Sequence, residues 1–198
     1  MFTRSNISAA LLISLLVPAA VSAQGAGDRP SIVLFANGGG NSALTNLDDA
    51  GTSSLKTGWT AGGGIGLQIN PYVAVRGTFD FAQAKGEGAV SAFNGQRFNH
   101  FFYGGDVQLR YPTASGFAPY LLLGAGAVTI DNIDAAAFNR FTKFAGKGGI
   151  GLEYLPAGSD LGFFAQGASY IYKYDRNGFN KTQADVLWTA GLSYRLAY

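Results

Sequence analysis

Several residue types that commonly build functional sites are scarce in this chain. Its 198 residues include no cysteine, one histidine and one methionine. The lack of cysteine excludes disulfides and thiolate metal sites, and one histidine cannot supply a set of imidazole ligands for a transition metal. We therefore predict no metal site and no cofactor.

Charge of either sign is also limited. The chain has 14 Lys and Arg residues against 12 Asp and Glu residues, and removal of the N-terminal leader described below takes Arg4 away. The remaining balance argues against a nucleic-acid partner, and no run of like charges indicates a lipid-binding tail.

Long apolar runs are absent after the first segment of the chain. Arg4 precedes an apolar stretch over residues 7–20, and Val21-Ser22-Ala23 provides small residues for cleavage. This pattern predicts a secretory signal peptide over residues 1–23, cut between Ala23 and Gln24, with the mature domain over residues 24–198. The alternative of an N-terminal membrane anchor is disfavoured because the run is shorter than about 20 residues. No later segment approaches 18 apolar residues, which excludes a helical membrane protein.

The mature chain instead contains eight runs in which apolar and polar residues alternate. Such a period of two indicates β-strands with one apolar and one polar face. The clearest run places Trp59, Ile65 and Leu67 on one face and Thr60 and Gln68 on the other. The predicted strands cover about residues 31–40, 57–69, 73–82, 99–111, 118–129, 142–154, 161–174 and 184–198. The fifth and seventh runs are apolar on both faces and leave their facing open.

The connections between these runs alternate in length. Three short ones contain proline, near residues 70–72, 112–116 and 155–160. Four longer ones, rich in Gly, Asn and Asp, cover residues 41–56, 83–98, 130–141 and 175–183. Short turns on one side and long loops on the other are typical of an all-β, eight-stranded antiparallel up-and-down transmembrane barrel. Both termini and the short turns are then expected to be periplasmic, and the four long loops extracellular.

Aromatic residues are expected to form girdles at both ends of the barrel wall. The predicted outer girdle contains Trp59, Phe79, Phe81, Phe101, Tyr103, Phe144, Tyr172 and Trp188. The predicted periplasmic girdle contains Tyr72, Tyr111, Phe117, Tyr154, Phe163, Tyr194 and Tyr198. A soluble barrel of the lipocalin type would be apolar inside, whereas here the charged face must be the interior. A charge on the lipid side costs about 2–4 kcal/mol at the bilayer midplane.

The inward face carries the candidate site residues. We predict an ionic cluster in the lumen made of Arg76, Asp80, Asp106, Arg110, Lys143, Lys147, Glu153 and Arg195. An eight-stranded interior is just wide enough for side chains to fill it, so opposite charges are expected to pair. A polar plug is the preferred interpretation, and a gated ion path through rearranging pairs is the alternative.

The C-terminal strand resembles the assembly signal of bacterial outer-membrane proteins. That signal has a polar residue, Gly two positions later, two hydrophobic positions and an aromatic terminus. The matching residues here are Thr189, Gly191, Tyr194, Leu196 and Tyr198.

Together with the signal peptide, the alternating runs and the strand that begins at Pro119, this signal identifies a family resemblance. The mature chain from about Ser31 to Tyr198 resembles the small porin-like outer-membrane barrels, a group that includes the OmpA membrane domain, OmpX, Ail and the opacity proteins. The resemblance implies the Gram-negative outer membrane, with lipopolysaccharide, periplasmic chaperones and the barrel-assembly machinery as partners. A host or surface ligand for the loops is a further expectation.

Three sequence features could indicate catalysis or ligand binding. His100 would be the base if the chain resembled the lipid-A deacylases, but Phe102 stands where that pattern places Ser. The Gly146-x-Gly148-x-x-Gly151 spacing lies inside a predicted strand, and no helix follows it, so a nucleotide loop is not expected. Loop carboxylates at Asp48, Asp49, Asp131 and Asp134 are expected to be solvated, with cation-bridged lipopolysaccharide as the alternative. We predict no enzyme activity.

Two classes of function remain. The first is a structural or surface-interaction barrel that acts through four extracellular loops and has a polar, largely plugged lumen. The second is a narrow porin-like channel for ions or small solutes. The pairable charge of the predicted lumen favours the first.

Overall fold

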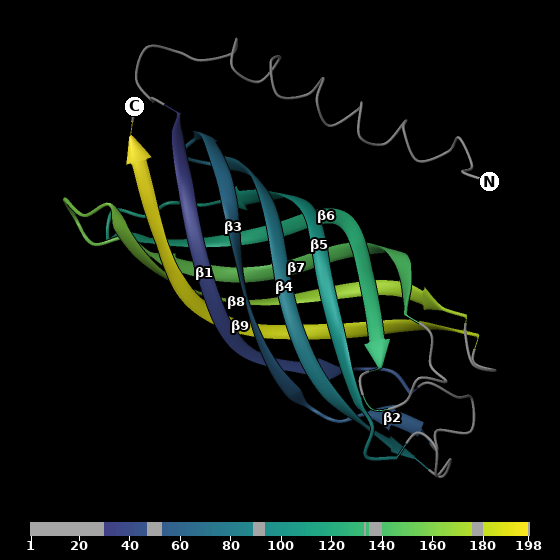
Figure 1. Cartoon of the computed structure of the whole chain (residues 1–198). Coiled ribbons are helices and arrows are strands. Elements are labelled where there is room, and N and C mark those ends of the chain that lie inside the picture. Colours follow the sequence, from purple (N-terminus) through teal and green to yellow (C-terminus); the bar gives the residue numbers. More distant parts are fainter. Residues whose placement is uncertain are drawn as a thin grey trace, which may run out of the picture.

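A computed structural model describes residues 30–46, 53–88, 94–132, 134, 140–175 and 180–197 of the chain (Figure 1). The predicted signal peptide, Tyr198 and the loop carboxylates Asp48 and Asp49 lie outside these residues. Among the described residues no helix is long and apolar enough to cross a membrane.

Eight long strands and one short strand make up the described fold. They are β1 (Ser31–Ala43), β2 (Ser53–Leu55), β3 (Gly58–Asn70), β4 (Val73–Gly88), β5 (Arg97–Arg110), β6 (Phe117–Asn132), β7 (Phe141–Tyr154), β8 (Leu161–Tyr174) and β9 (Lys181–Ala197). Each long strand pairs antiparallel with its two neighbours, in the cyclic order β1-β3-β4-β5-β6-β7-β8-β9. The pairing of β1 with β9 closes the sheet, which confirms the predicted eight-stranded antiparallel barrel.

The three-residue strand β2 was not predicted. It pairs with Gly86–Gly88 of β4, where β4 and β5 extend beyond the neighbouring strands (Figure 1). These residues fall in the predicted loop over residues 41–56, because three residues are too few to show a period of two.

Both described ends of the chain lie at the same end of the barrel as the three short connections, and we call this the termini end (Figure 1). The opposite end is called the loop end. At the first short connection Pro71 fits a tight turn, and the Asn70 side-chain oxygen accepts hydrogen bonds from the amides of Tyr72 and Val73, both at 2.9 Å. In the second, Gly116 adopts a φ of 85°, which favours glycine.

Burial alternates along the strands and resolves the faces that the sequence left open. On β6, Leu122 is fully buried in the lumen, while Leu121 and Leu123 are exposed on the outer wall. On β8, Phe164 points inward and Phe163 outward. The prediction was wrong for Tyr172: its ring is 3 % exposed and lies in the lumen, not in the outer girdle. β8 alternates with Phe163 outward, so every even-numbered residue, including Tyr172, faces inward.

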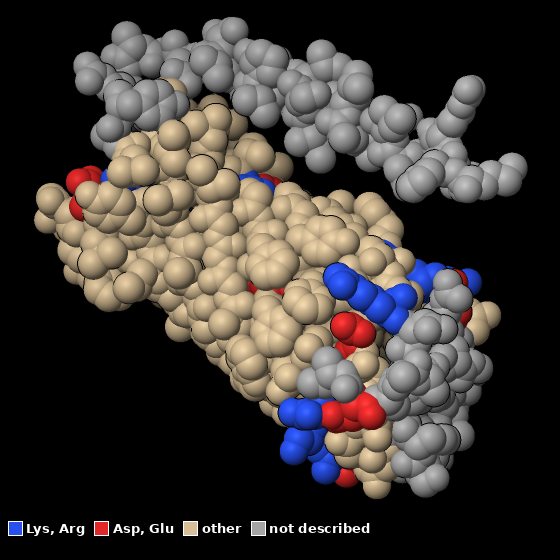
Figure 2. Space-filling model, viewed as in Figure 1, with Lys and Arg blue, Asp and Glu red and all other residues tan. Residues whose placement is uncertain are grey.

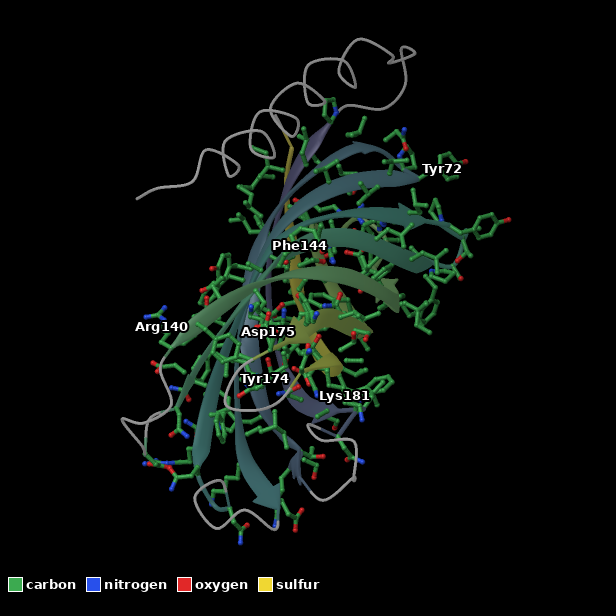
Figure 3. The ribbon with its side chains drawn as sticks, turned by 90° about the vertical axis from the view of Figure 1, so that its right-hand side faces the viewer. Tyr72, Arg140, Phe144, Tyr174, Asp175 and Lys181 are labelled. Carbon is green, nitrogen blue, oxygen red and sulfur yellow. The ribbon has the colours of Figure 1, made fainter. Side chains whose placement is uncertain are left out.

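The outer wall is apolar and carries aromatic side chains near both ends. Towards the loop end, the rings of Trp59 and Phe81 have centroids 5.1 Å apart, and Phe81 and Phe101 follow at 5.3 Å. At the termini end, Tyr72 projects away from the ribbon (Figure 3). Figure 2 shows charged side chains gathered towards the loop end of one face, next to a continuous uncharged surface. This distribution fits a wall that contacts hydrocarbon between two interfaces.

Candidate functional site: the barrel lumen

The charged residues of the lumen form separate groups at different heights. Nearest the termini end, Glu153 on β7 accepts hydrogen bonds from Ser193 at 2.7 Å and from Arg195 at 3.2 Å. Arg110 also donates to Glu153, and it donates to the Gln68 side chain at 2.8 Å. We call Arg110, Glu153 and Arg195 the lower group.

A second group lies nearer the middle of the barrel. Asp106 on β5 accepts a hydrogen bond from Arg76 Nε at 2.7 Å and one from Lys147 Nζ at 2.6 Å. Lys147 also donates to the Thr78 hydroxyl at 3.2 Å, so this middle group connects β4, β5 and β7. The Asp106 carboxylate is fully buried and is compensated by two cations, as a buried carboxylate requires.

Little space separates these two groups. A small cavity of about 20 Å³ lies between them, and Arg76, Arg110 and Glu153 line it together with Phe35 and Phe164. Such a volume holds about one water molecule. Arg76 Nη2 and Arg110 Nε have no hydrogen-bond partner among the described residues, and a water in this cavity would satisfy them.

Asp80 marks the next level and is held from two other strands. Its carboxylate accepts hydrogen bonds from the Tyr170 hydroxyl on β8 and from the Asn37 amide on β1, each at 3.2 Å. β4 and β8 lie on opposite walls, four positions apart in the strand order. The Tyr170 side chain therefore crosses the lumen.

The loop half of the lumen contains an apolar cluster as well as buried polar side chains, among them Asn41, Thr60 and Gln183. Inward-facing residues there form an apolar cluster of Leu55, Ala82, Ala84, Phe98, Phe102, Val128, Ile130, Ala145, Tyr170, Tyr172, Tyr174 and Leu187. The rings of Phe102 and Tyr170 pack with centroids 4.5 Å apart, and Leu55 is contributed by β2. Inside this cluster, His100 Nδ1 lies 3.6 Å from Asp185 Oδ2.

The last predicted cluster member, Lys143, lies apart from the others near the loop end. It forms an ion pair with Asp175, which is exposed, rather than with the buried carboxylates. Asp134 beyond the end of β6 binds Arg97, and this hydrogen bonding lowers the pKa of the Asp134 carboxyl. The eight predicted residues therefore do not form one cluster. Three form the lower group, three form the middle group, Asp80 lies apart from both, and Lys143 lies near the loop end.

The described residues of the predicted assembly signal lie on β9. Tyr194 and Leu196 face outward and are opposite Leu34 and Ile32 of β1, at the seam that closes the barrel. Thr189 and Gly191 face inward. A methyl group on Gly191 would lie 2.1 Å from the Ala36 carbonyl oxygen, so glycine is the residue that this close approach accepts.

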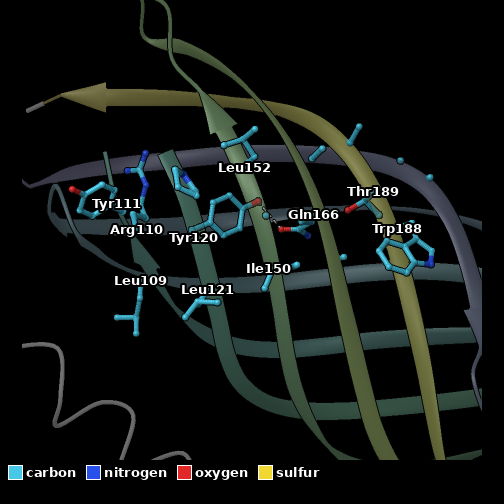
Figure 4. Close-up of a pocket in the computed structure, with 17 residues that line it drawn as sticks. Leu109, Arg110, Tyr111, Tyr120, Leu121, Ile150, Leu152, Gln166, Trp188 and Thr189 are labelled. Carbon is cyan, nitrogen blue, oxygen red and sulfur yellow. Dashed lines mark hydrogen bonds between the residues drawn. The ribbon is translucent and has the colours of Figure 1, made fainter. Parts of the chain in front are cut away.

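A groove of about 1020 Å³ on the barrel wall crosses β5 to β9 and reaches β1 (Figure 4). Its bulky outward-facing residues are Leu109, Tyr111, Leu121, Ile150, Leu152 and Trp188. Behind them, inside the lumen, Tyr120 donates a hydrogen bond to Gln166 at 3.1 Å. The position and the apolar lining suit contact with hydrocarbon chains.

Several lumen residues were not singled out by the sequence. Tyr120, Tyr170, Tyr172 and Asp185 supply hydrogen bonds or ion pairs from β6, β8 and β9. Their inward facing could have been read from the alternation, but which of them meet across the lumen depends on the barrel closure. The Gly146-x-Gly148-x-x-Gly151 stretch lies inside β7, as predicted. Among the described residues, no group of three or more His, Cys, Asp or Glu side chains is placed to hold a metal ion.

A closed sheet with an apolar outer wall, aromatic ends and a charged interior defines a transmembrane β-barrel protein. The model of the outer membrane protein beta-barrel domain matches residues 8–196, and the chain belongs to this family. No curated protein sequence matches the chain.

Two solved structures are similar in fold. Neisserial surface protein A, NspA, has a TM-score of 0.63 and 16 % identity, over 83 % of this chain and 97 % of that chain. The outer membrane protein AlkL has a TM-score of 0.52 and 17 % identity, over 89 % of this chain and 95 % of that chain. Both likenesses concern the barrel architecture.

Proposed function

We propose that this protein is a structural or surface-interaction barrel of the outer membrane with a closed lumen. The observation that carries the proposal is the filling of the interior: two ionic groups separated by a cavity of about 20 Å³, followed by an apolar cluster. An ion path needs a continuous water column, and this interior holds room for about one water between the two groups. The barrel wall and its loops then carry the function.

In this proposal the loop end faces the outside of the cell and the termini end faces the periplasm. The leader is removed after Ala23, and lipopolysaccharide surrounds the loop half of the wall. Arg140 supports the contact with lipid headgroups, because its guanidinium lies over the outward-facing Phe101 ring at 5.6 Å. A cation just beyond an aromatic girdle is suited to the phosphates of a membrane interface.

Single-channel recording of the purified protein in planar bilayers tests the closed lumen. We expect at most small and brief conductance events. A steady, large conductance from the unmodified protein would contradict the proposal and support the narrow channel instead.

We further propose that Tyr194 and Tyr198 act in assembly through the barrel-assembly machinery. Tyr194 faces outward at the closing seam and is 46 % exposed, so it is accessible on the barrel wall. The Tyr194→Ala variant without Tyr198 should accumulate unfolded in the periplasm but refold in detergent. Normal surface insertion of this variant in cells would contradict the role in assembly.

A further inference from the structure

The small cavity between the middle and lower groups is lined by two guanidiniums that each keep a donor without a partner. Arg76 Nη2 and Arg110 Nε are buried, and neither has a hydrogen-bond partner among the described residues. Both side chains line the cavity of about 20 Å³, and they are 7 % and 5 % exposed. Leaving a buried charged donor unsatisfied is costly, so we expect a guest that accepts hydrogen bonds in this cavity.

The other contacts of these two guanidiniums fix their positions. Arg76 donates through Nε to Asp106 at 2.7 Å, and its guanidinium carbon lies 5.1 Å from the centre of the Phe35 ring. Arg110 donates through Nη1 to Gln68 and through Nη2 to Glu153. The two nitrogens without a partner therefore cannot turn to another acceptor unless one of these contacts breaks.

The charges around the cavity do not balance. The middle and lower groups contain four basic side chains, Arg76, Arg110, Lys147 and Arg195, and two acidic ones, Asp106 and Glu153. The other buried carboxylates of the described chain, Asp80 and Asp185, lie further towards the loop end. The surroundings of the cavity therefore carry an excess of positive charge, which an anion would neutralise and a water molecule would not.

The rest of the cavity wall is also compatible with an anion. Phe35 and Phe164 form an apolar side, with ring centroids 6.2 Å apart, and Gln68 and Gln108 carry amide donors. Glu153 is the one carboxylate among the lining residues, and its oxygens already accept hydrogen bonds from two guanidiniums and a hydroxyl. In such a place of low dielectric constant, guanidiniums bind an anion more strongly than they do at the surface.

We propose that the cavity binds one halide ion, such as chloride, and that this ion joins the middle and lower groups. The ion accepts hydrogen bonds from Arg76 Nη2 and Arg110 Nε and compensates the excess charge. Chloride is only slightly larger than a water molecule, so it suits a cavity with room for about one water, whereas polyatomic anions such as sulfate need more space. The proposal concerns a bound ion, so it does not depend on whether the lumen conducts.

The stability of the barrel tests this proposal, because an ion that binds only the folded form stabilises it. The mature protein in phospholipid vesicles is unfolded in urea at constant ionic strength, with chloride exchanged for gluconate. The equilibrium constant for unfolding should fall as chloride rises, by at most about tenfold for each tenfold increase, as binding of one ion requires. Bromide should replace chloride, and sulfate at the same ionic strength should have no such effect.

Two matched substitutions separate this site from general effects of salt. Arg76→Lys keeps a cation beside Asp106 but removes the second nitrogen, so it should shift the chloride dependence to concentrations about tenfold or more higher. Arg97→Lys makes the same change at an exposed ion pair with Asp134 and should keep the chloride dependence of the parent. Heat-modifiable electrophoretic mobility shows that each variant has folded.

Crystals of the unmodified protein grown with bromide supply a measurement that needs no variant. Anomalous scattering should place one bromide in the cavity between Arg76 and Arg110, and its absence there would overturn the proposal. A stability of the parent that does not depend on chloride would also overturn it, even with bromide visible in the crystals, because water would then be the ordinary guest. The same holds if Arg76→Lys folds and responds to chloride as the parent does.

Discussion

Glycines of this barrel differ in what surrounds them. A methyl group on Gly151 would lie 2.3 Å from the Tyr120 ring, and one on Gly191 would lie 2.1 Å from the Ala36 carbonyl oxygen. Both glycines face the lumen. Gly148 on the outer face of β7 has nothing within 4 Å of the same position. Gly151 and Gly191 therefore allow close packing in the lumen, whereas Gly148 leaves the outer wall smooth.

This difference predicts unequal costs for the same substitution. Gly191→Ala should destabilise the folded barrel by about 1–3 kcal/mol, because the methyl group forces the β1–β9 seam apart. Gly148→Ala should change stability by about 0.5 kcal/mol or less, because its methyl group enters open space. Reversible unfolding in urea with the protein in lipid vesicles measures both. An equal loss of stability in both variants would show that the β1–β9 seam accommodates the added methyl group without a loss of free energy.

Glu153 is the second residue whose environment predicts a large effect. Three side chains donate hydrogen bonds to its carboxylate, and two of them are the Arg110 and Arg195 guanidiniums. Glu153→Gln leaves the buried Arg110 and the partly buried Arg195 without a counter-charge and should cost about 3–5 kcal/mol. Glu87→Gln breaks an exposed ion pair with Lys56 and should cost about 1 kcal/mol or less. A loss of stability at position 153 no larger than that at position 87 would mean that water solvates the lower group.

At the scale of the strands, the aromatic side chains near the loop end indicate where the hydrocarbon region ends. Phe81 and Phe101 are opposite each other on β4 and β5, and Gln83 and Asn99 form the next outward pair towards the loop end. Gln83 donates a hydrogen bond to Asn99 at 2.9 Å. The outer wall therefore becomes polar at the next pair of outward-facing residues. Ile65 on β3 lies on the other side of this limit, and its side chain is exposed on the apolar outer wall.

Lysine substitutions at these two outward positions should therefore differ. Ile65→Lys places an ammonium in hydrocarbon and should cost about 2–4 kcal/mol, whereas Gln83→Lys, at the interface, should cost about 0–1 kcal/mol. Folding equilibria in vesicles of one lipid composition compare the two. A similar cost for both would mean that the hydrocarbon region extends further towards the loop end than Phe81 and Phe101 indicate.

Most of the strand architecture could be predicted from the sequence, and the reason lies in the period of two. On β4, Arg76, Thr78 and Asp80 alternate with Val75, Gly77 and Phe79, which fixes both the strand and its facing. The strands were predicted too short towards the loop end. β4 continues to Gly88 and β5 begins at Arg97. There the outward residues, such as Lys85 and Arg97, become polar, while Ala84 and Phe98 stay buried in the lumen.

The candidate site could be predicted as a set of inward residues but not as contacts. Alternation identifies Asp106 and Lys147 as inward, yet their meeting depends on the shear and closure of the barrel. The pairing of His100 with Asp185 shows this most clearly, because the two residues lie on opposite walls. Lys143 faces inward as predicted, but it lies too close to the loop end to reach the buried carboxylates.

At the scale of the whole molecule, the closed lumen that we propose contains two barriers of different chemistry in series. The termini half is closed by charged groups that satisfy one another, and the loop half is closed by an apolar cluster that β2 completes. Water or ions must pass both barriers to cross the barrel. Removal of either barrier alone therefore leaves the other in place.

This arrangement predicts strongly non-additive effects on conductance. Arg76→Ala should disturb the middle group but leave planar-bilayer conductance near that of the parent, because the apolar cluster remains. Phe102→Ala should open space beside Tyr170 but also have little effect, because the ionic groups remain. The double variant should conduct far more than the sum of the two single variants, as coupled barriers in series require. Folding of all three chains, shown by heat-modifiable mobility, is the control. A large conductance from Arg76→Ala alone would mean that the apolar cluster does not close the loop half.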